Sequence, residues 1–115
     1  MAIAEQVVGQ YLVLVPDGRL VLGGLSEEYE QRVQVLLNGG SLHLVTDLRR
    51  VPQIDSTGVR AVVRGYTTAQ RLGGSFKLAS PPATVRMVLQ VTKLDTVLPI
   101  FDSVEAATVE ASRKA

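Results

Sequence analysis

The chain of 115 residues contains no cysteine and a single histidine, His43. Without cysteine it can form no disulfide, no zinc–thiolate site and no thiol nucleophile. One histidine is too few for most metal sites. The composition therefore excludes several classes of redox, metal-binding and cysteine-dependent protein, and it fits a cytoplasmic protein.

An excess of charge of either sign is also missing. The 12 basic and 11 acidic side chains give a formal net charge of +1, which does not favour nucleic acid or an anionic membrane as a partner. No apolar run approaches the roughly 18 residues of a membrane span. Residues 1–6 lack the basic start and apolar core of a signal peptide. We therefore expect a soluble protein that does not insert into membranes.

Patterns for phosphate binding and catalysis are absent as well. No stretch matches a P-loop or a dinucleotide-binding fingerprint. The glycine pairs at 23–24, 39–40 and 73–74 are better explained as breaks between elements. The one histidine lies in an expected strand, so no serine has an evident general base beside it. We expect no cofactor, no metal and no enzymatic activity.

Apolar residues make up 46% of the chain, enough for a real core. The length suits one domain, which we expect to span residues 1–115 with a core at about 6–111. The apolar patterns predict strands at 6–9, 11–15, 19–22, 41–48, 76–79 and 97–101, and helices at 26–38, at 59–72, after 81–82 and after 103. Alternation of strands and helices predicts an α/β domain with a mixed sheet.

Local signals set several of these boundaries. The turn signal at 16–18 predicts that residues 11–22 form a hairpin. Ser26 precedes two glutamates, so we expect it to be the N-cap of the first helix. Pro99 predicts that the last strand lies at an edge of the sheet, and Ser103 is expected to cap the last helix.

Four residues, Asp55-Ser56-Thr57-Gly58, lie between a predicted central strand and a predicted amphipathic helix. At a helix start the Ser56 hydroxyl can be displayed rather than bonded within a turn. Asp55 or Thr57 can accept a free helix amide, and Gly58 lets another backbone come close and tolerates unusual torsions. In most proteins such residues only cap a helix, and capping is compatible with the display of a functional hydroxyl at Ser56.

The stretch at 45–58 resembles the STAS domain family, which covers sulfate transporter and anti-sigma-factor antagonist domains. The family pattern is an apolar strand ending in Asp-Leu, then Val, then an apolar residue followed by Asp-Ser-x-Gly. Those places are filled in order by Asp47-Leu48, Val51, Ile54 and Asp55-Ser56-Thr57-Gly58. Further matches are the glycines at 73–74, the prolines at 81–82 and the stretch at 97–101, so the similarity covers roughly residues 11–109.

The resemblance implies a single STAS-like domain with a mixed central sheet of about five strands and about four helices. It implies an anti-sigma-factor antagonist, whose motif serine is phosphorylated by a partner that is both an anti-sigma factor and a serine/threonine kinase. The unphosphorylated antagonist binds that partner and frees the sigma factor. Carried onto this chain, Ser56 is the phosphoacceptor, Thr57 is the second candidate, and Asp55 and Gly58 complete the partner-binding loop.

Other readings of the same family stay open. The chain could be a signalling scaffold like those of the stressosome, in which case it would form homo-oligomers. It could instead be the STAS subunit of an ABC-type lipid transport complex. Arg60, Arg64 and Arg71 share one face of a predicted helix, at spacings of four and seven. They form a candidate face for an acidic partner, or simply a solvated polar face. Asp47 is expected to bond loop amides or to cap its strand end.

Two positions depart from the family pattern. Family antagonists often carry acidic residues just after the glycine that corresponds to Gly18, whereas residues 20–22 are apolar here. We expect this to leave apolar surface beside the loop, at Val21 and Leu22, for a different partner. The family also often has glycine where Lys93 stands. A left-handed backbone there would be strained for lysine.

Overall fold

The computed structural model describes residues 2–109. Its elements follow one another as β1 (Ile3–Val8), β2 (Tyr11–Pro16), α1 (Ser26–Asn38), β3 (His43–Asp47), α2 (Ser56–Arg71), β4 (Ser75–Ala79), α3 (Ala83–Val91), the short 3-10 helix η1 (Leu94–Thr96), β5 (Ile100–Phe101) and α4 (Val104–Val109). The strands form one sheet in the order β1-β2-β3-β4-β5. β1 runs antiparallel to β2 and the other neighbours are parallel. The expected α/β fold with a mixed five-stranded sheet and four helices is confirmed.

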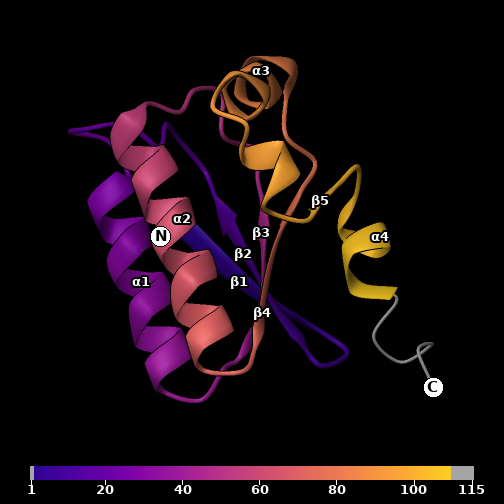
Figure 1. Cartoon of the computed structure of the whole chain (residues 1–115). Helices are drawn as coiled ribbons and strands as arrows, with labels where there is room; N and C mark the ends of the chain where they lie inside the picture. Colours follow the sequence, from indigo (N-terminus) through magenta and orange to yellow (C-terminus); the bar gives the residue numbers. More distant parts are fainter. Residues whose placement is uncertain (1, 110–115) are drawn as a thin grey trace.

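The helices are divided unequally over the sheet (Figure 1). α1 and α2 lie side by side on one face, α3 and η1 lie across one end, and α4 lies on the other face. The larger core lies under α1 and α2 and includes Leu44, Phe76 and Leu78. A hydrogen bond of 2.6 Å between the Tyr29 hydroxyl and Thr46 Oγ1 ties α1 to β3 inside this core. These parallel β–α units bring both helix N-termini to the same end of the molecule.

The predicted hairpin at 11–22 is wrong, because the hairpin is formed by β1 and β2. A two-residue loop joins them, and Gly9 has φ +61° at its first position, as in a type II′ turn. Residues 19–22 are not a strand. Only Leu20 pairs there, through a single parallel bridge to Ile54. Leu20 is fully buried, so this segment is held against the loop before α2 rather than against the preceding strand.

Further boundaries differ from the prediction: β1 begins at Ile3 instead of residue 6, and α2 begins at Ser56 instead of residue 59. Ser26 is not the N-cap of α1: Leu25 holds that position, and no side chain bonds the first amides. The predicted last strand shortens to β5, because η1 and Pro99 occupy the chain just before it. β5 does lie at a sheet edge, as the proline predicts. Ser103 caps α4 as expected, since its Oγ accepts a 3.0 Å hydrogen bond from the Ala106 amide.

Lys93 adopts the left-handed conformation that glycine favours, with φ +63° and ψ +19°. It follows Thr92, the C-cap of α3, and is the N-cap of η1, and its side chain is exposed. Lysine thus stands in a backbone conformation that suits glycine, and it takes up the steric cost of a left-handed residue, about 1–2 kcal/mol.

Candidate functional site

The loop before α2 is fixed by the carboxylate of Asp55, the N-cap of this helix. Its Oδ1 accepts hydrogen bonds from the amides of Thr57 (2.9 Å) and Gly58 (3.2 Å), and its Oδ2 accepts one from the amide of Leu22 (2.9 Å). The Thr57 hydroxyl adds a 2.6 Å bond to Oδ1. One carboxylate thus satisfies two helix amides and joins the loop to a segment more than thirty residues earlier.

These bonds favour the ionised form of Asp55. The hydrogen bond from the Thr57 side chain and then that from the Leu22 amide lower the pKa of Asp55 to about 2. Since the folded pKa lies below the usual value near 4, the cap contributes stability above about pH 4 and loses it as the pH falls towards 2. At neutral pH the loop therefore carries a fixed negative charge.

Ser56 is the first residue of α2, and its side chain is exposed. Among the described residues no hydrogen bond involves its hydroxyl. The residues on either side of Ser56 are fixed, because Asp55 is the cap and Thr57 bonds to it. The hydroxyl is therefore displayed to solvent from a rigid backbone, as expected for a group that reacts with or contacts another molecule.

Thr57, the second candidate acceptor, has a different environment. Its hydroxyl lies 2.6 Å from Asp55 Oδ1 and 2.9 Å from Ser26 Oγ. A hydroxyl has one hydrogen and an ionised carboxylate only accepts, so Thr57 donates to Asp55 and Ser26 donates to Thr57. The Thr57 hydroxyl is engaged in positioning the cap, and Ser26 extends this chain of bonds to the start of α1.

Gly58 allows a close approach of two backbones. A Cβ at this position would lie 2.2 Å from the Leu20 carbonyl oxygen and 2.6 Å from Ile54 Cγ1. Because its φ is not in the positive range, glycine is needed here for space and not for torsion. The Leu20 amide donates to the Gln53 carbonyl, and the Leu20 carbonyl accepts from the Asp55 amide. The segment around Leu20 is thus a support for the loop.

This support was not predicted from the sequence, and neither was the role of Ser26. Ser26 is 2% exposed, and its hydroxyl faces α2 instead of its own helix amides. The placement of an apolar residue two positions after Gly18 is the one sequence signal for the support. The apolar run at 20–22 equally fits a strand, so this signal alone does not reveal the support.

Asp47 ends β3 and is 5% exposed. Its Oδ1 accepts a 3.0 Å hydrogen bond from the Arg49 amide, and its Oδ2 lies 3.8 Å from the Arg49 guanidinium. The expectation that Asp47 bonds loop amides is confirmed. This carboxylate fixes the far end of the same loop that Asp55 closes.

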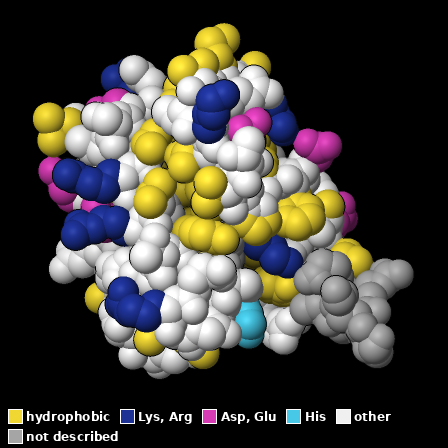
Figure 2. All heavy atoms as spheres, in the orientation of Figure 1, with side chains coloured by type: hydrophobic (Ala, Val, Ile, Leu, Met, Phe, Trp, Pro, Cys, Tyr) yellow, Lys and Arg dark blue, Asp and Glu magenta, His cyan; other side chains and the backbone are white. Residues whose placement is uncertain are grey.

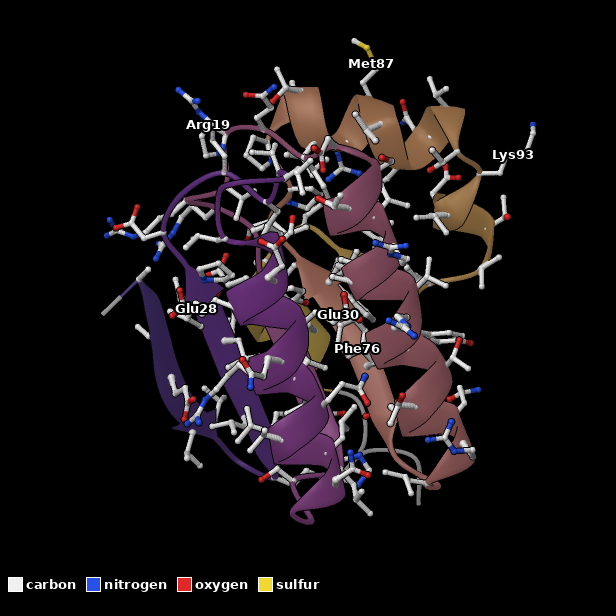
Figure 3. The ribbon with its side chains drawn as sticks, turned by 90° about the vertical axis from the view of Figure 1, so that its left-hand side faces the viewer. Arg19, Glu28, Glu30, Phe76, Met87 and Lys93 are labelled. Carbon is white, nitrogen blue, oxygen red and sulfur yellow. The ribbon has the colours of Figure 1, made fainter. Side chains whose placement is uncertain are left out.

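Arg60, Arg64 and Arg71 all lie on the exposed side of α2. Basic side chains gather over this helix in Figure 2. Arg64 is paired with Glu30 of α1, with 2.6 Å between Nη1 and Oε2, and Figure 3 shows Glu30 between the two helices. No ion pair is recorded for Arg60 or Arg71 among the described residues. The three arginines therefore share a face, but one of them is already neutralised.

Apolar surface does lie beside the loop, as the missing acidic residues predict. Leu22 is 69% exposed, while its amide is held by Asp55; Val21 is half-buried. Across residues 2–109 we find no cluster of three or more His, Asp or Glu side chains able to hold a metal ion. None of the helices in that range is both long enough and apolar enough to cross a membrane.

Known proteins resemble this chain over nearly its whole length. The family model for the STAS domain matches residues 2–107. A Thermotoga maritima protein named "Putative anti-sigma factor antagonist" is 28% identical over 109 residues, which cover 95% of this chain and 96% of that protein. A Thermotoga neapolitana homologue is 28% identical over 105 residues, covering 91% and 93%.

Solved structures show the same fold. The crystal structure of a Thermotoga maritima "putative anti-sigma factor antagonist" superposes with a TM-score of 0.90 at 28% identity, covering 96% of this chain and 95% of that one. The anti-sigma factor antagonist SpoIIAA in its unphosphorylated form gives a TM-score of 0.73 at 20% identity, covering 99% and 100%. At that identity the second likeness concerns the fold alone.

Proposed function

The chain belongs to the STAS domain family, and from this premise we propose that it is an anti-sigma-factor antagonist controlled by phosphorylation at Ser56. In its unphosphorylated form it binds an anti-sigma factor through residues 55–58 and the adjacent surface of α2. That anti-sigma factor is also a serine kinase, and phosphate on Ser56 weakens the complex. Two relatives named as antagonists match this chain over nearly their whole length, and this similarity supports the proposal.

The observation that carries the proposal is the exposed Ser56 hydroxyl between two fixed neighbours. Asp55 and Thr57 are bonded to each other and to the helix start, whereas the Ser56 hydroxyl has no partner among the described residues. A site that only capped the helix would not need an exposed serine, because Asp55 already does the capping. Ser56 is therefore the acceptor, and Thr57 has a positioning role.

The chemical step belongs to the partner. Ser56 Oγ attacks the γ-phosphorus of ATP, the bond from that phosphorus to the bridging oxygen breaks, and ADP leaves. The hydroxyl proton passes to a base on the kinase, since residues 2–109 place no histidine beside Ser56. We therefore propose that this chain is a substrate and a binding module, and not an enzyme.

Phosphate would act on binding more than on folding. It adds a charge of about −1.5 to −2 beside Asp55, which is already ionised. The N-terminus of α2 favours that anion locally. A partner seated on the same surface would have to desolvate both charges, which opposes binding. We place Arg60 and Arg71 on the rim of this surface, where they would meet acidic groups of the partner.

The proposal is tested with purified anti-sigma-factor kinase from the same organism. Wild type and Ser56→Ala should bind it, and Ser56→Asp should bind at least tenfold more weakly. With ATP, phosphate should enter wild type and Thr57→Ala, but not Ser56→Ala.

Ser103→Asp is the matched control, because Ser103 also starts a helix and aspartate can take over its cap. It should behave as wild type in both assays. Equal binding by Ser56→Asp and wild type would refute the switch. Phosphate retained in Ser56→Ala would refute the assignment of the acceptor.

A further inference from the structure

β1 is an open edge of the sheet. The other edge, β5, has two residues and follows Pro99, whereas β1 has six and pairs without a bulge along its whole length. Four consecutive residues, Ala4 to Val7, are exposed. Proline, bulges and charged side chains, lysine above all, are the usual protection of an edge strand. β1 has no proline, lysine or bulge, and its one charged side chain, Glu5, is paired with Arg32 of α1. So weakly protected an edge of this length is a template for another strand.

The hydrogen-bonding pattern shows which groups face outward. The Asp17 amide donates to the Ala2 carbonyl, and the two-residue loop makes Val8 and Tyr11 a closing pair. In an antiparallel ladder the bonded pairs alternate, so the even-numbered residues of β1 bond to β2. The amides and carbonyls of Glu5 and Val7 therefore point away from β2, into solvent.

These outward groups fit a second copy of the same strand. Two identical strands related by a twofold axis must pair odd residues with odd residues here. A register centred on Glu5 would set two carboxylates opposite each other, which is unfavourable. A register centred on Gln6 instead pairs Glu5 of each copy with Val7 of the other. That register makes four backbone hydrogen bonds and brings two neutral amides face to face.

Apolar side chains flank this edge on the face that carries α1. Val7 is 75% exposed, and Val35 of α1 is 55% exposed beside a groove that Ile3 and Ala4 also line. Arg32 pairs with Glu5 from the same helix, so a single carboxylate set opposite Val7 of the other copy is not left without a counter-charge. We propose that two copies of this chain associate through antiparallel β1–β1 pairing about Gln6, forming a continuous ten-stranded sheet. The inference is independent of the proposed role of Ser56.

The absence of cysteine makes a direct test available. Gln6→Cys introduces one thiol per chain, and in the proposed register the two thiols face each other in a non-hydrogen-bonded pair. Their Cα atoms would then be about 4.5 Å apart, within the range of a disulfide. Mild oxidation should give a disulfide-linked dimer in good yield. Gln10→Cys, in the exposed turn of the same hairpin, is the matched control and should remain mostly monomeric.

Sedimentation supplies the second measurement. Wild type should sediment as a dimer at micromolar to millimolar concentration. Val7→Pro should sediment as a monomer and remain folded by circular dichroism. The amide that it removes faces outward, and proline is tolerated at such an edge position. A monomeric wild type at all these concentrations, a Val7→Pro dimer, or equal crosslinking of the two cysteine variants would overturn the proposal.

Discussion

The two faces of the sheet are covered to very different depths. On one face α1 and α2 bury a continuous cluster of large apolar side chains, among them Leu44 and Phe76. On the other face α4 contributes one buried residue, Ala107, and the small cluster around it includes Tyr11 and Val45. The difference indicates that most of the folding free energy comes from the helical pair, to which the Ser56 loop is attached.

Neighbouring residues of β4 show the contrast most directly, because successive side chains of a strand point to opposite faces. Phe76 lies between α1 and α2 in Figure 3, so close to Gly65 that a Cβ there would be 2.6 Å from its ring. Lys77 points the other way and is 7% exposed. Its Nζ donates to the Tyr11 hydroxyl and to the Ala107 carbonyl, each at 2.9 Å, and lies 4.7 Å from the centre of the Tyr11 ring.

The largest effect is expected from Phe76→Ala. This change opens a cavity under two helices that are tied to the sheet elsewhere and cannot fully collapse into it. We expect the free energy of unfolding to fall by about 3–5 kcal/mol. Urea denaturation followed by circular dichroism measures the loss. A loss below about 1 kcal/mol would contradict the view that the α1–α2 face dominates stability.

A smaller effect is expected from Lys77→Met, the adjacent change on the α4 face. Methionine keeps most of the apolar stem and volume, so global stability should change by less than about 1.5 kcal/mol. The bond to the Ala107 carbonyl is lost, and α4 should therefore open more easily. Hydrogen exchange should show faster exchange in α4 and unchanged exchange in α2. A global loss as large as that of Phe76→Ala would remove the contrast between the faces.

The smallest effects concern backbone strain. Ser80 and Lys93 are the two non-glycine residues with positive φ, +57° and +63°, among the described residues. Lys93→Gly should raise the free energy of unfolding by about 0.5–1 kcal/mol. The change removes the steric cost of a left-handed lysine, and the added flexibility of the unfolded chain offsets part of this gain. Thermal unfolding measures the gain.

Ser80→Gly is the matched change near α4. It should gain less, because the Ser80 hydroxyl also reaches the Asp102 carbonyl at 3.4 Å. If Ser80→Gly were the more stabilising of the two and slowed exchange in α4, strain rather than thin packing would explain the weaker face.

The sequence predicted the order of most elements and the helix start at which Ser56 lies, because both follow from local patterns. Periodicity and the Asp-Ser-x-Gly motif placed Ser56 at a helix start, where the structure has it. The hairpin was misplaced because the chain offers two turn signals, one at Gly9 and one at 16–18. Local rules do not decide between them. The burial of Leu20 against Ile54 does.

The contacts that complete the site could not be predicted, since they join distant parts of the chain. Ser26 bonds Thr57 across 31 positions, and the Leu22 amide bonds Asp55 across 33. Lys77 was part of an alternating strand, where alternation predicts an outward polar side chain. Its burial depends on α4, whose docking is a tertiary event that no periodicity encodes.

The exposed Ser56 hydroxyl also has a kinetic consequence. Many modification sites react only during rare local opening, so their rates follow the population of the opened form. Ser56 needs no opening, because its side chain is exposed in the native state. On the proposed function, phosphorylation of Ser56 would need no local unfolding, so its rate would not follow the population of opened forms and would not depend on how stable the domain is.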